Sequence, residues 1–307
     1  MKKIISIIIT IITCLSLIAC SSEKHNNKIK IVCTTFAQYD WTNEIIKGKE
    51  EIFDVILLMN ENVDLHNYQP TVKDIAIIKE SDLFIYIGGE SDAWTKDIQP
   101  NNNNSINLVE IMGYELEEHT EEHENNEHNH EHDEHIWLSL KNAKKCIEII
   151  SENIIKLDAK NIDLYTQNTN NYLEKINTLD TQYEEMISNS SLKTILFADR
   201  FPFKNLANDY DLEYYAAFSG CSAETEASFD TLTKLANIID AKNLNYVFVL
   251  ENSSNDIANS IINITKNKNQ KILIINSMQS KQTKSYLEIM KDNYEILYKS
   301  LENKIND

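Results

Sequence analysis

Short apolar runs alternate with helical stretches along most of the chain. Three runs are rich in β-branched and other large apolar residues and are typical of buried strands: 29–33, 52–58 and 83–87. Helical patterns follow two of them, near Asp40–Lys47 and Val72–Lys79. A fourth strand is expected at 106–109. Strands that alternate with helices in this way predict a parallel sheet covered by helices.

The second half of the chain repeats the alternation. Its expected strands are 193–198, 213–218, 246–250 and 271–275. The helical stretches between and after them lie near 203–208, 229–241, 255–267 and 285–305. This half therefore predicts a second α/β lobe.

Two helices are expected between the lobes, at 142–157 and 162–188. Apolar residues of the second helix recur every three or four positions, which places them on one face: Tyr172, Ile176, Leu179, Tyr183 and Met186. At about 1.5 Å per residue this helix spans roughly 40 Å, enough to connect two lobes rigidly. The predicted fold class is α/β, with two lobes, each a mostly parallel sheet flanked by helices, joined by one long rigid helix. The expected boundaries are 29–157 for the first lobe, 158–190 for the linking helix and 191–307 for the second lobe.

The amino end has the pattern of an export signal. Lys2 and Lys3 precede an apolar run that ends at Ala19, and Cys20 follows directly. The run is short for a membrane span. The sequence Leu-Ile-Ala-Cys resembles a bacterial lipobox, so residues 1–19 are predicted to be a signal peptide and Cys20 a lipidated residue. Residues 20–28 form a polar tether. The mature protein is therefore expected outside the cytoplasm, anchored by lipid to the bacterial cell membrane.

The tract from Glu115 to His135 interrupts the α/β pattern. It holds ten acidic residues and six histidines and almost nothing apolar, so it predicts a mobile loop within the first lobe. The tract reads either as a solvated linker or as a weak, multivalent metal-capturing segment. The capturing histidines would be His119, His123, His128, His130 and His132.

The charge balance narrows the function. The chain has 48 acidic and 29 basic residues and a net charge of −19, which argues against a nucleic-acid binder and favours cationic ligands. Removal of the signal peptide and lipidation of Cys20 would leave three cysteines of the five: Cys33, Cys146 and Cys221. An odd, widely spaced set does not form a disulfide framework. Buried structural thiols are the favoured interpretation.

Side chains able to bind a metal follow several predicted strands. Open α/β sheets bind ligands beyond the carboxyl ends of their strands. In the first half these positions include Asp64 and His66, and His135 lies where the apolar pattern resumes. In the second half they include Asp199, Cys221, Glu251 and Asn276. Two facing lobes would bring such residues together.

Four segments resemble one family, the zinc/manganese solute-binding lipoproteins of bacterial ABC importers. They begin at Val32 (VCTTF), Val63 (VDLHNYQPT), Asp82 (DLFIYIGG) and Glu134 (EHIWLS). The resemblance runs from about residue 28 to the end and is strongest in the first lobe. It implies two α/β lobes, joined by a long helix, that hold one metal ion in the cleft between them.

The resemblance carries over unevenly to the ligands. It places His66 and His135 at the two first-lobe histidine ligands. A strict count puts Arg200 at the third position, and since arginine cannot bind a cation, Asp199 is taken as the third ligand. The fourth position falls on Asn276, a neutral and weaker ligand. Cys221, Glu226 and Glu251 are possible replacements in the second lobe.

These residues lead to a first functional hypothesis. Two imidazoles and a carboxylate suit Zn²⁺, or Mn²⁺ if more oxygen is present, and a cysteine would favour zinc. The resemblance implies a protein that captures the ion and delivers it to an ABC permease in the cytoplasmic membrane. A monomer is expected. Binding should weaken below the imidazole pKa of about 6.5, because only neutral histidine binds the ion.

Other interpretations remain open. His66 could be a lone surface histidine, His135 part of the loop, and Asp199 a partner of Arg200 or a helix cap. For Asn276 and Glu251, a turn or cap role is favoured over a ligand role. The alternative function is a surface adhesin or interaction lipoprotein with a structural metal. An enzyme is not expected: His128 and His132 are four apart, but Asn129 stands where a zinc protease needs glutamate. A metal-dependent hydrolase also needs a general base, and no residue stands out for that role.

Overall fold

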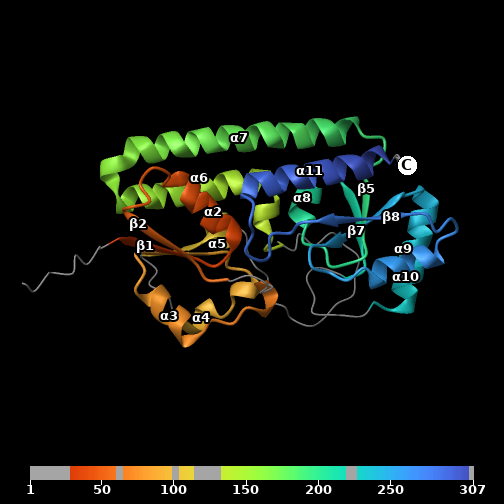
Figure 1. The fold of residues 1–307 in the computed structure, drawn as a ribbon, viewed down its shortest axis with the longest axis horizontal. Coiled ribbons are helices and arrows are strands. Elements are labelled where there is room, and N and C mark those ends of the chain that lie inside the picture. Colours follow the sequence, from red (N-terminus) through yellow and green to blue (C-terminus); the bar gives the residue numbers. More distant parts are fainter. Residues whose placement is uncertain (1–27, 60–64, 99–103, 114–132, 219–226, 304–307) are drawn as a thin grey trace, which may run out of the picture.

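The computed structural model describes residues 28–59, 65–98, 104–113, 133–218 and 227–303. They form two four-stranded parallel sheets, one in each half of the chain, with long helices laid across them (Figure 1). The signal peptide, Cys20, the histidines from 119 to 132, Cys221 and Glu226 all lie outside the described residues. The expected fold class is confirmed.

The first sheet has the strand order β2-β1-β3-β4. Its strands are β1 (Ile29–Cys33), β2 (Phe53–Leu57), β3 (Leu83–Tyr86) and β4 (Ser105–Asn107). Ile31 on the inner strand β1 pairs with Val55 on one side and Leu83 on the other. The connecting helices are α2 (Phe36–Ile45), α3 (Val72–Lys79), α4 (Thr95–Ile98) and α5 (Leu108–Ile111), with short 3₁₀ turns η1 (Leu65–Asn67) and η2 (Glu90–Asp92).

The second sheet repeats this arrangement, in the order β6-β5-β7-β8. Its strands are β5 (Thr194–Phe197), β6 (Glu213–Ala216), β7 (Tyr246–Leu250) and β8 (Lys271–Ile275). Helices α8 (Lys204–Asp209), α9 (Phe229–Lys242) and α10 (Asp256–Ile264) connect them. All five residues of β7 are buried, as expected for an inner strand with an uninterrupted apolar sequence.

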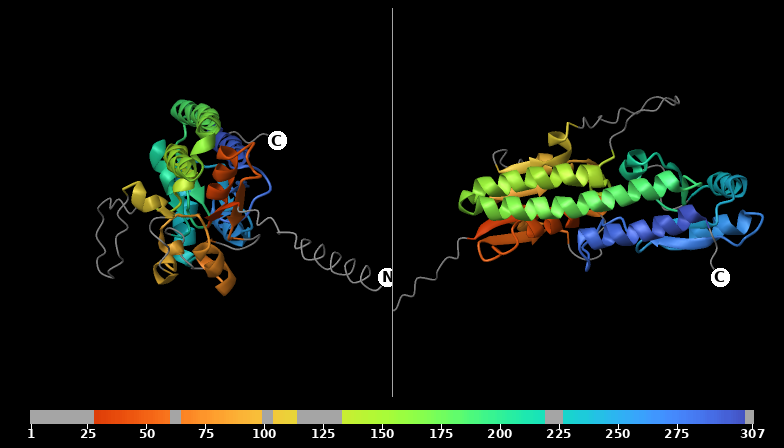
Figure 2. Two further views of the ribbon diagram at one scale, coloured as in Figure 1. Left: turned by 90° about the vertical axis from the view of Figure 1, so that its left-hand side faces the viewer. Right: turned by 90° about the horizontal axis from the view of Figure 1, so that it is seen from above.

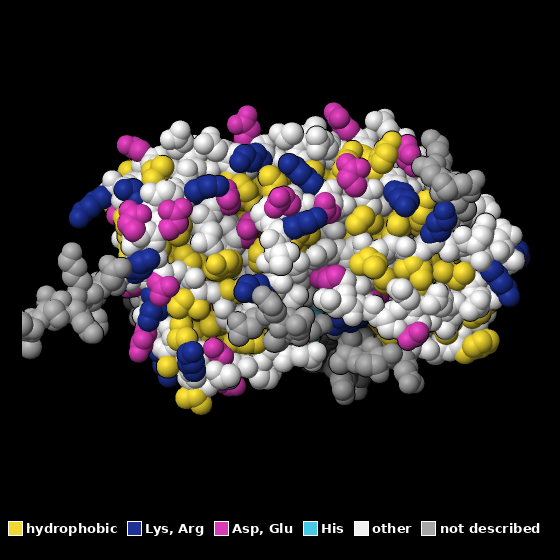
Figure 3. Space-filling model, in the orientation of Figure 1, with side chains coloured by type: hydrophobic (Ala, Val, Ile, Leu, Met, Phe, Trp, Pro, Cys, Tyr) yellow, Lys and Arg dark blue, Asp and Glu magenta, His cyan; other side chains and the backbone are white. Residues whose placement is uncertain are grey.

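Three longer helices hold the halves together: α6 (Leu140–Leu157), α7 (Ile162–Asn189) and α11 (Tyr286–Glu302). Seen from above, the 28-residue α7 lies between α6 and α11 and extends over both sheets (Figure 2). The five apolar residues predicted to share one face of α7 are all buried. Basic and acidic side chains are interspersed over the molecular face seen in Figure 3. Two further 3₁₀ turns, η3 (Ile136–Leu138) and η4 (Ala159–Asn161), precede α6 and α7.

One apolar core crosses from the first half to the second. At the junction, Trp41 meets Tyr286 edge to face, with ring centroids 5.1 Å apart. The Tyr286 hydroxyl donates to the Trp137 carbonyl over 2.7 Å, and the Trp137 indole donates to the Ser277 carbonyl over 2.9 Å. Buried aromatic residues whose polar atoms find partners make a specific interface. The two halves are therefore packed directly against each other through this shared core.

The element boundaries differ from the sequence prediction at two instructive places. Helix α2 begins at Phe36 instead of Asp40, because Thr35 and Gln38 form a capping box at its start. The strand expected at 106–109 ends at Asn107, whose side chain accepts from the Glu110 amide and so starts α5. Apolar pattern alone could not separate a strand end from a helix start.

Among the residues that the structure describes, no helix combines the length and apolarity needed to cross a membrane.

Candidate metal centre

His66 projects from the 3₁₀ turn η1, beyond the carboxyl end of β2. Its neighbour Leu65 is 1% exposed and anchors the turn in the core. The His66 side chain keeps 18% of its surface exposed. The local sequence thus fixes the backbone through leucine and leaves the imidazole at the edge of the first sheet.

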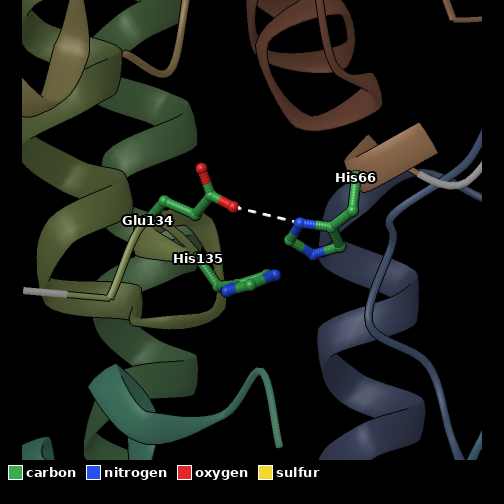
Figure 4. Close-up of side chains that lie close together, drawn as sticks. All are labelled: His66, Glu134 and His135. Carbon is green, nitrogen blue, oxygen red and sulfur yellow. Dashed lines mark ion pairs between the residues drawn. The ribbon is translucent and has the colours of Figure 1, made fainter. Parts of the chain in front are cut away.

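His135 reaches the same place from a distant part of the chain. It immediately precedes η3, in which Trp137 is fully buried and bonded to Ser277. Its own side chain is only 2% exposed. The ring centroids of His66 and His135 are 5.3 Å apart, and Figure 4 shows the outer nitrogen of His135 directed toward the His66 ring. The structure therefore brings the two predicted histidines together.

Glu134 is a third member of this group that the sequence analysis did not single out. One ligand atom from each of His66, Glu134 and His135 lies within 4.8 Å of the others. The acidic tract concealed Glu134, because it is one of ten similar residues there. Its place next to His135, at the point where the apolar pattern resumes, was the one signal that the sequence offered.

The Glu134 carboxylate is held by the turn that follows β3. Oε1 accepts from the Ser91 hydroxyl over 2.6 Å, and Oε2 accepts from the Ser91 amide over 3.0 Å. Oε1 is also 3.3 Å from Nδ1 of His66, the contact drawn in Figure 4. A Cβ atom at Gly89 would come within 2.0 Å of Oε2, so glycine leaves the space that the carboxylate occupies.

His135 has its own partners on both ring nitrogens. Nδ1 contacts Oδ1 of Asp133, which also accepts from the His135 amide over 2.8 Å. Burial opposes the charged form of Asp133, but the adjacent His135 and its hydrogen bonds outweigh it and hold the pKa of Asp133 below its usual value. Nε2 of His135 is 2.9 Å from the side-chain nitrogen Nε2 of Gln279, a buried residue beyond β8.

The predicted second-lobe ligands that the structure describes, Asp199, Glu251 and Asn276, are not part of this group. Asp199 Oδ1 accepts from the amide of the next residue, Arg200, over 2.8 Å, and Oδ2 accepts from the Leu250 amide at the end of β7 over 3.0 Å. The Asn276 side-chain oxygen accepts from the Met278 amide. In the described structure, Asp199 and Asn276 therefore accept hydrogen bonds from nearby backbone amides, and a ligand role for either residue stays a prediction.

Glu251 is likewise bound to its own surroundings. Its carboxylate accepts from the Ser277 amide over 2.7 Å and from the Ser277 hydroxyl over 2.8 Å. Burial raises the pKa of Glu251, and these hydrogen bonds only partly offset the effect. Glu251 thus supports the loop that carries Gln279. The sequence analysis did not single out Gln279, the residue of this loop that contacts His135.

The two cysteines that the structure describes are buried in the core. Cys33 lies within β1, and burial raises the pKa of its thiol to about 12. A thiol that resists ionisation is a poor metal ligand, since thiolate is the binding form. The interpretation of Cys33 as a structural residue agrees with this position.

The donor atoms at the group are imidazole nitrogen and carboxylate oxygen, which are both ordinary zinc ligands. Two neutral imidazoles suit zinc better than manganese, which favours oxygen. Nothing in the group resembles a nucleophile activated by a base. The arrangement can bind and release a divalent cation.

Comparisons with known proteins agree with this geometry. A family model described as "Zinc-uptake complex component A periplasmic" matches residues 31–300. The chain is 29% identical over 294 residues to the high-affinity zinc uptake system protein ZnuA of Bacillus subtilis, covering 92% of this chain and 90% of that protein. It is 27% identical over 312 residues to the zinc-binding lipoprotein AdcA of Streptococcus pneumoniae, covering 97% of this chain and 60% of that protein.

Solved structures show the same fold. The metal-dependent lipoprotein YcdH of Bacillus subtilis superposes with a TM-score of 0.73 at 27% identity, covering 90% of this chain and 100% of that chain. Fold, paired histidines and the length of the family match lead to one conclusion: the chain belongs to the family of periplasmic component A proteins of zinc-uptake complexes.

Proposed function

We propose that this protein captures one Zn²⁺ ion outside the cytoplasm and delivers it to an ABC permease. The observation that carries the proposal is the approach of two histidines from distant segments, with ring centroids 5.3 Å apart and acidic partners beside both. The chemistry is coordination and release, without bond making, which fits a family described as a component of zinc uptake.

Zinc is the proposed cargo and Mn²⁺ the less favoured one. The two imidazoles are neutral nitrogen donors when they bind an ion, and the carboxylates next to them supply negative charge nearby. Relatives support the choice, since those from Bacillus subtilis and Streptococcus pneumoniae are described as zinc uptake and zinc-binding proteins.

The finer features of location are also proposals. A lipid chain on Cys20 would hold the mature protein at the membrane surface beside its permease, and AdcA, described as a lipoprotein, supports this. We further propose that the protein acts as a monomer. The boundaries given above for signal peptide, tether, lobes and linking helix belong to the same proposal.

Calorimetry with Zn²⁺ tests the proposal directly. The wild-type protein should bind one ion with submicromolar affinity, and His66→Ala should weaken binding by more than about 100-fold, beyond the usual effect of losing an outer partner. His25→Ala makes the same substitution in the tether and should leave the affinity unchanged. Unaltered tight binding by His66→Ala would overturn the proposal.

The alternative, an adhesin with a structural metal, makes a different prediction about folding. One apolar core joins both halves of this protein, so the fold has ample support apart from an ion. The apoprotein should therefore melt cooperatively in the presence of a chelator, and zinc should only raise the melting temperature, by an amount that grows with the logarithm of its concentration over Kd. Loss of the folded state on chelation would favour the structural role.

A further inference from the structure

Ser91 lies between His66 and Glu134, and its hydrogen bonds determine the role of each. Its hydroxyl oxygen is 2.6 Å from Glu134 Oε1 and 2.8 Å from His66 Nδ1. A serine hydroxyl has only one proton to donate, whereas an ionised carboxylate can only accept. The proton of Ser91 must therefore go to Glu134, and the hydroxyl oxygen must accept from His66.

This assignment fixes the tautomer of His66. If Ser91 accepts from Nδ1, then Nδ1 carries the ring proton and Nε2 carries the lone pair. The nearby Glu134 Oε1, 3.3 Å from Nδ1, favours a proton on the same nitrogen. Nε2 is then the only atom of His66 that can bind a cation.

His135 reaches the same tautomer through a different partner. Asp133 accepts from Nδ1, and the Gln279 amide group donates to Nε2 over 2.9 Å. Both contacts require the proton on Nδ1 and the lone pair on Nε2. The adjacent acids Asp133 and Glu134 thus face one histidine each, and both histidines present Nε2.

Glu134 has little freedom to become a ligand itself. Its carboxylate is held by the Ser91 hydroxyl and amide, in the space beside Gly89. The turn around it is fixed in turn by Asp92, which accepts from the Ile87 and Gly88 amides over 2.7 and 3.2 Å. Moving the carboxylate onto an ion would break the bonds to Ser91 and release His66.

We propose that Ser91 and Glu134 are positioning residues that hold His66 in the Nδ1–H tautomer, so that the ion meets two neutral Nε2 nitrogens and no first-lobe carboxylate. The inference rests on the proposed function for the identity of the ion. It also predicts selectivity, because a site of neutral nitrogen donors favours Zn²⁺ over the oxygen-preferring Mn²⁺. Second partners of this kind typically affect metal affinity by about 10 to 100-fold.

The first test needs no metal. Nitrogen-15 NMR of the histidine rings in the apoprotein should show His66 and His135 as Nδ1–H tautomers, and Ser91→Ala should reduce that preference at His66 alone. The matched control is Ser81→Ala, whose hydroxyl donates to the Ile78 carbonyl within its own turn. A wild-type His66 protonated on Nε2 would overturn the inference, whatever the protein binds.

The second test uses the sign of a change in Zn²⁺ affinity. If Glu134 positions His66, Ser91→Ala should weaken binding by about 10 to 100-fold. If Glu134 is a ligand instead, removal of the hydroxyl frees it, and the affinity should stay equal or rise. Gly89→Ala, which pushes Glu134 away without removing any donor, should weaken binding in the same way as Ser91→Ala.

The third test examines the coordination sphere with Co²⁺ as the probe. Glu134→Gln should bind Co²⁺ more weakly yet give the same visible absorption bands as the wild type, because the bound atoms are unchanged. Altered band positions or intensities would show that a ligand was lost and would overturn the inference. Absence of Zn²⁺ binding by the wild type would instead refute the proposed function, while the NMR result would still decide the tautomer.

Discussion

The two halves of the molecule contribute to the candidate site in different ways. The first half supplies His66, Glu134 and His135, whose ligand atoms lie within 4.8 Å of one another. The second half has acidic residues at equivalent sheet edges, but Asp199 and Glu251 hold backbone amides there. From the second half, the Gln279 side chain contacts a site histidine, His135. A carboxylate at a strand end is therefore evidence for a ligand only when the backbone around it is already satisfied.

The largest expected effect distinguishes a residue that binds the ion from one that only supports the fold. His135→Ala removes one of the two imidazoles and should weaken Zn²⁺ binding by more than about 100-fold, measured by competition with a chelating dye. Far-ultraviolet circular dichroism checks that the fold persists. If His135→Ala bound zinc like the wild type, the first half of the molecule would not supply the zinc ligands.

Asp199→Ala should do the opposite: it should lower the stability of the protein and leave its Zn²⁺ affinity nearly unchanged. It leaves two backbone amides near β5 and β7 without their acceptor, which costs about 2 kcal/mol of unfolding free energy, given about 1 to 3 kcal/mol for a buried unsatisfied group. Urea denaturation measures this loss, and Zn²⁺ affinity should change by less than a few fold. A large fall in Zn²⁺ affinity at unchanged stability would instead show that Asp199 is a ligand.

Gln279→Glu tests the difference between the two halves, because it gives the second half a carboxylate that could bind the ion. The group that now contacts Nε2 of His135 would become a carboxylate, an ordinary zinc ligand, so Zn²⁺ affinity should rise by about tenfold, or about 1.4 kcal/mol. Gln282→Glu, a neighbouring change in the same loop, controls for net charge. A decrease in affinity would show that the position does not face the ion.

The smallest effect concerns the seam between the halves, away from the ion. Asp40 on α2 accepts from the Tyr286 amide at the start of α11, and burial raises the pKa of Asp40 to about 6. The folded protein then binds a proton more readily than the unfolded chain, so this group adds stability as pH falls through 6 and removes it as pH rises.

Between pH 7 and pH 5 the Asp40 contribution to the free energy of unfolding should increase by about 1 kcal/mol. Asp40→Asn should lack that increment, because its amide does not titrate. Urea unfolding of the two apoproteins at both pH values measures the difference. Equal pH dependence in the variant and the wild type would contradict the assignment.

The sequence alone determined the fold class because the signals for it are local. Continuous apolar runs gave β1, β7 and β8 with the observed bounds, and the stepped apolar residues of α7 gave its buried face. Burial of an element depends mainly on its own pattern, so the pattern can be read before the partner is known. The same signals placed His66 after the second strand and His135 just before the apolar pattern resumes.

Only the tertiary structure decided which polar groups meet. Ser91 and Gln279 carry no distinguishing local signal, and Glu134 has only its place beside His135. Each of the three nevertheless contacts a site histidine that is 25 or more positions away in the sequence. In the sequence, Asp199 and Glu251 look equally suitable as metal ligands. In the structure, their oxygens accept hydrogen bonds from backbone amides of neighbouring segments. A polar side chain takes whichever partner the folded backbone leaves unsatisfied beside it, and that choice depends on contacts between segments far apart in the chain.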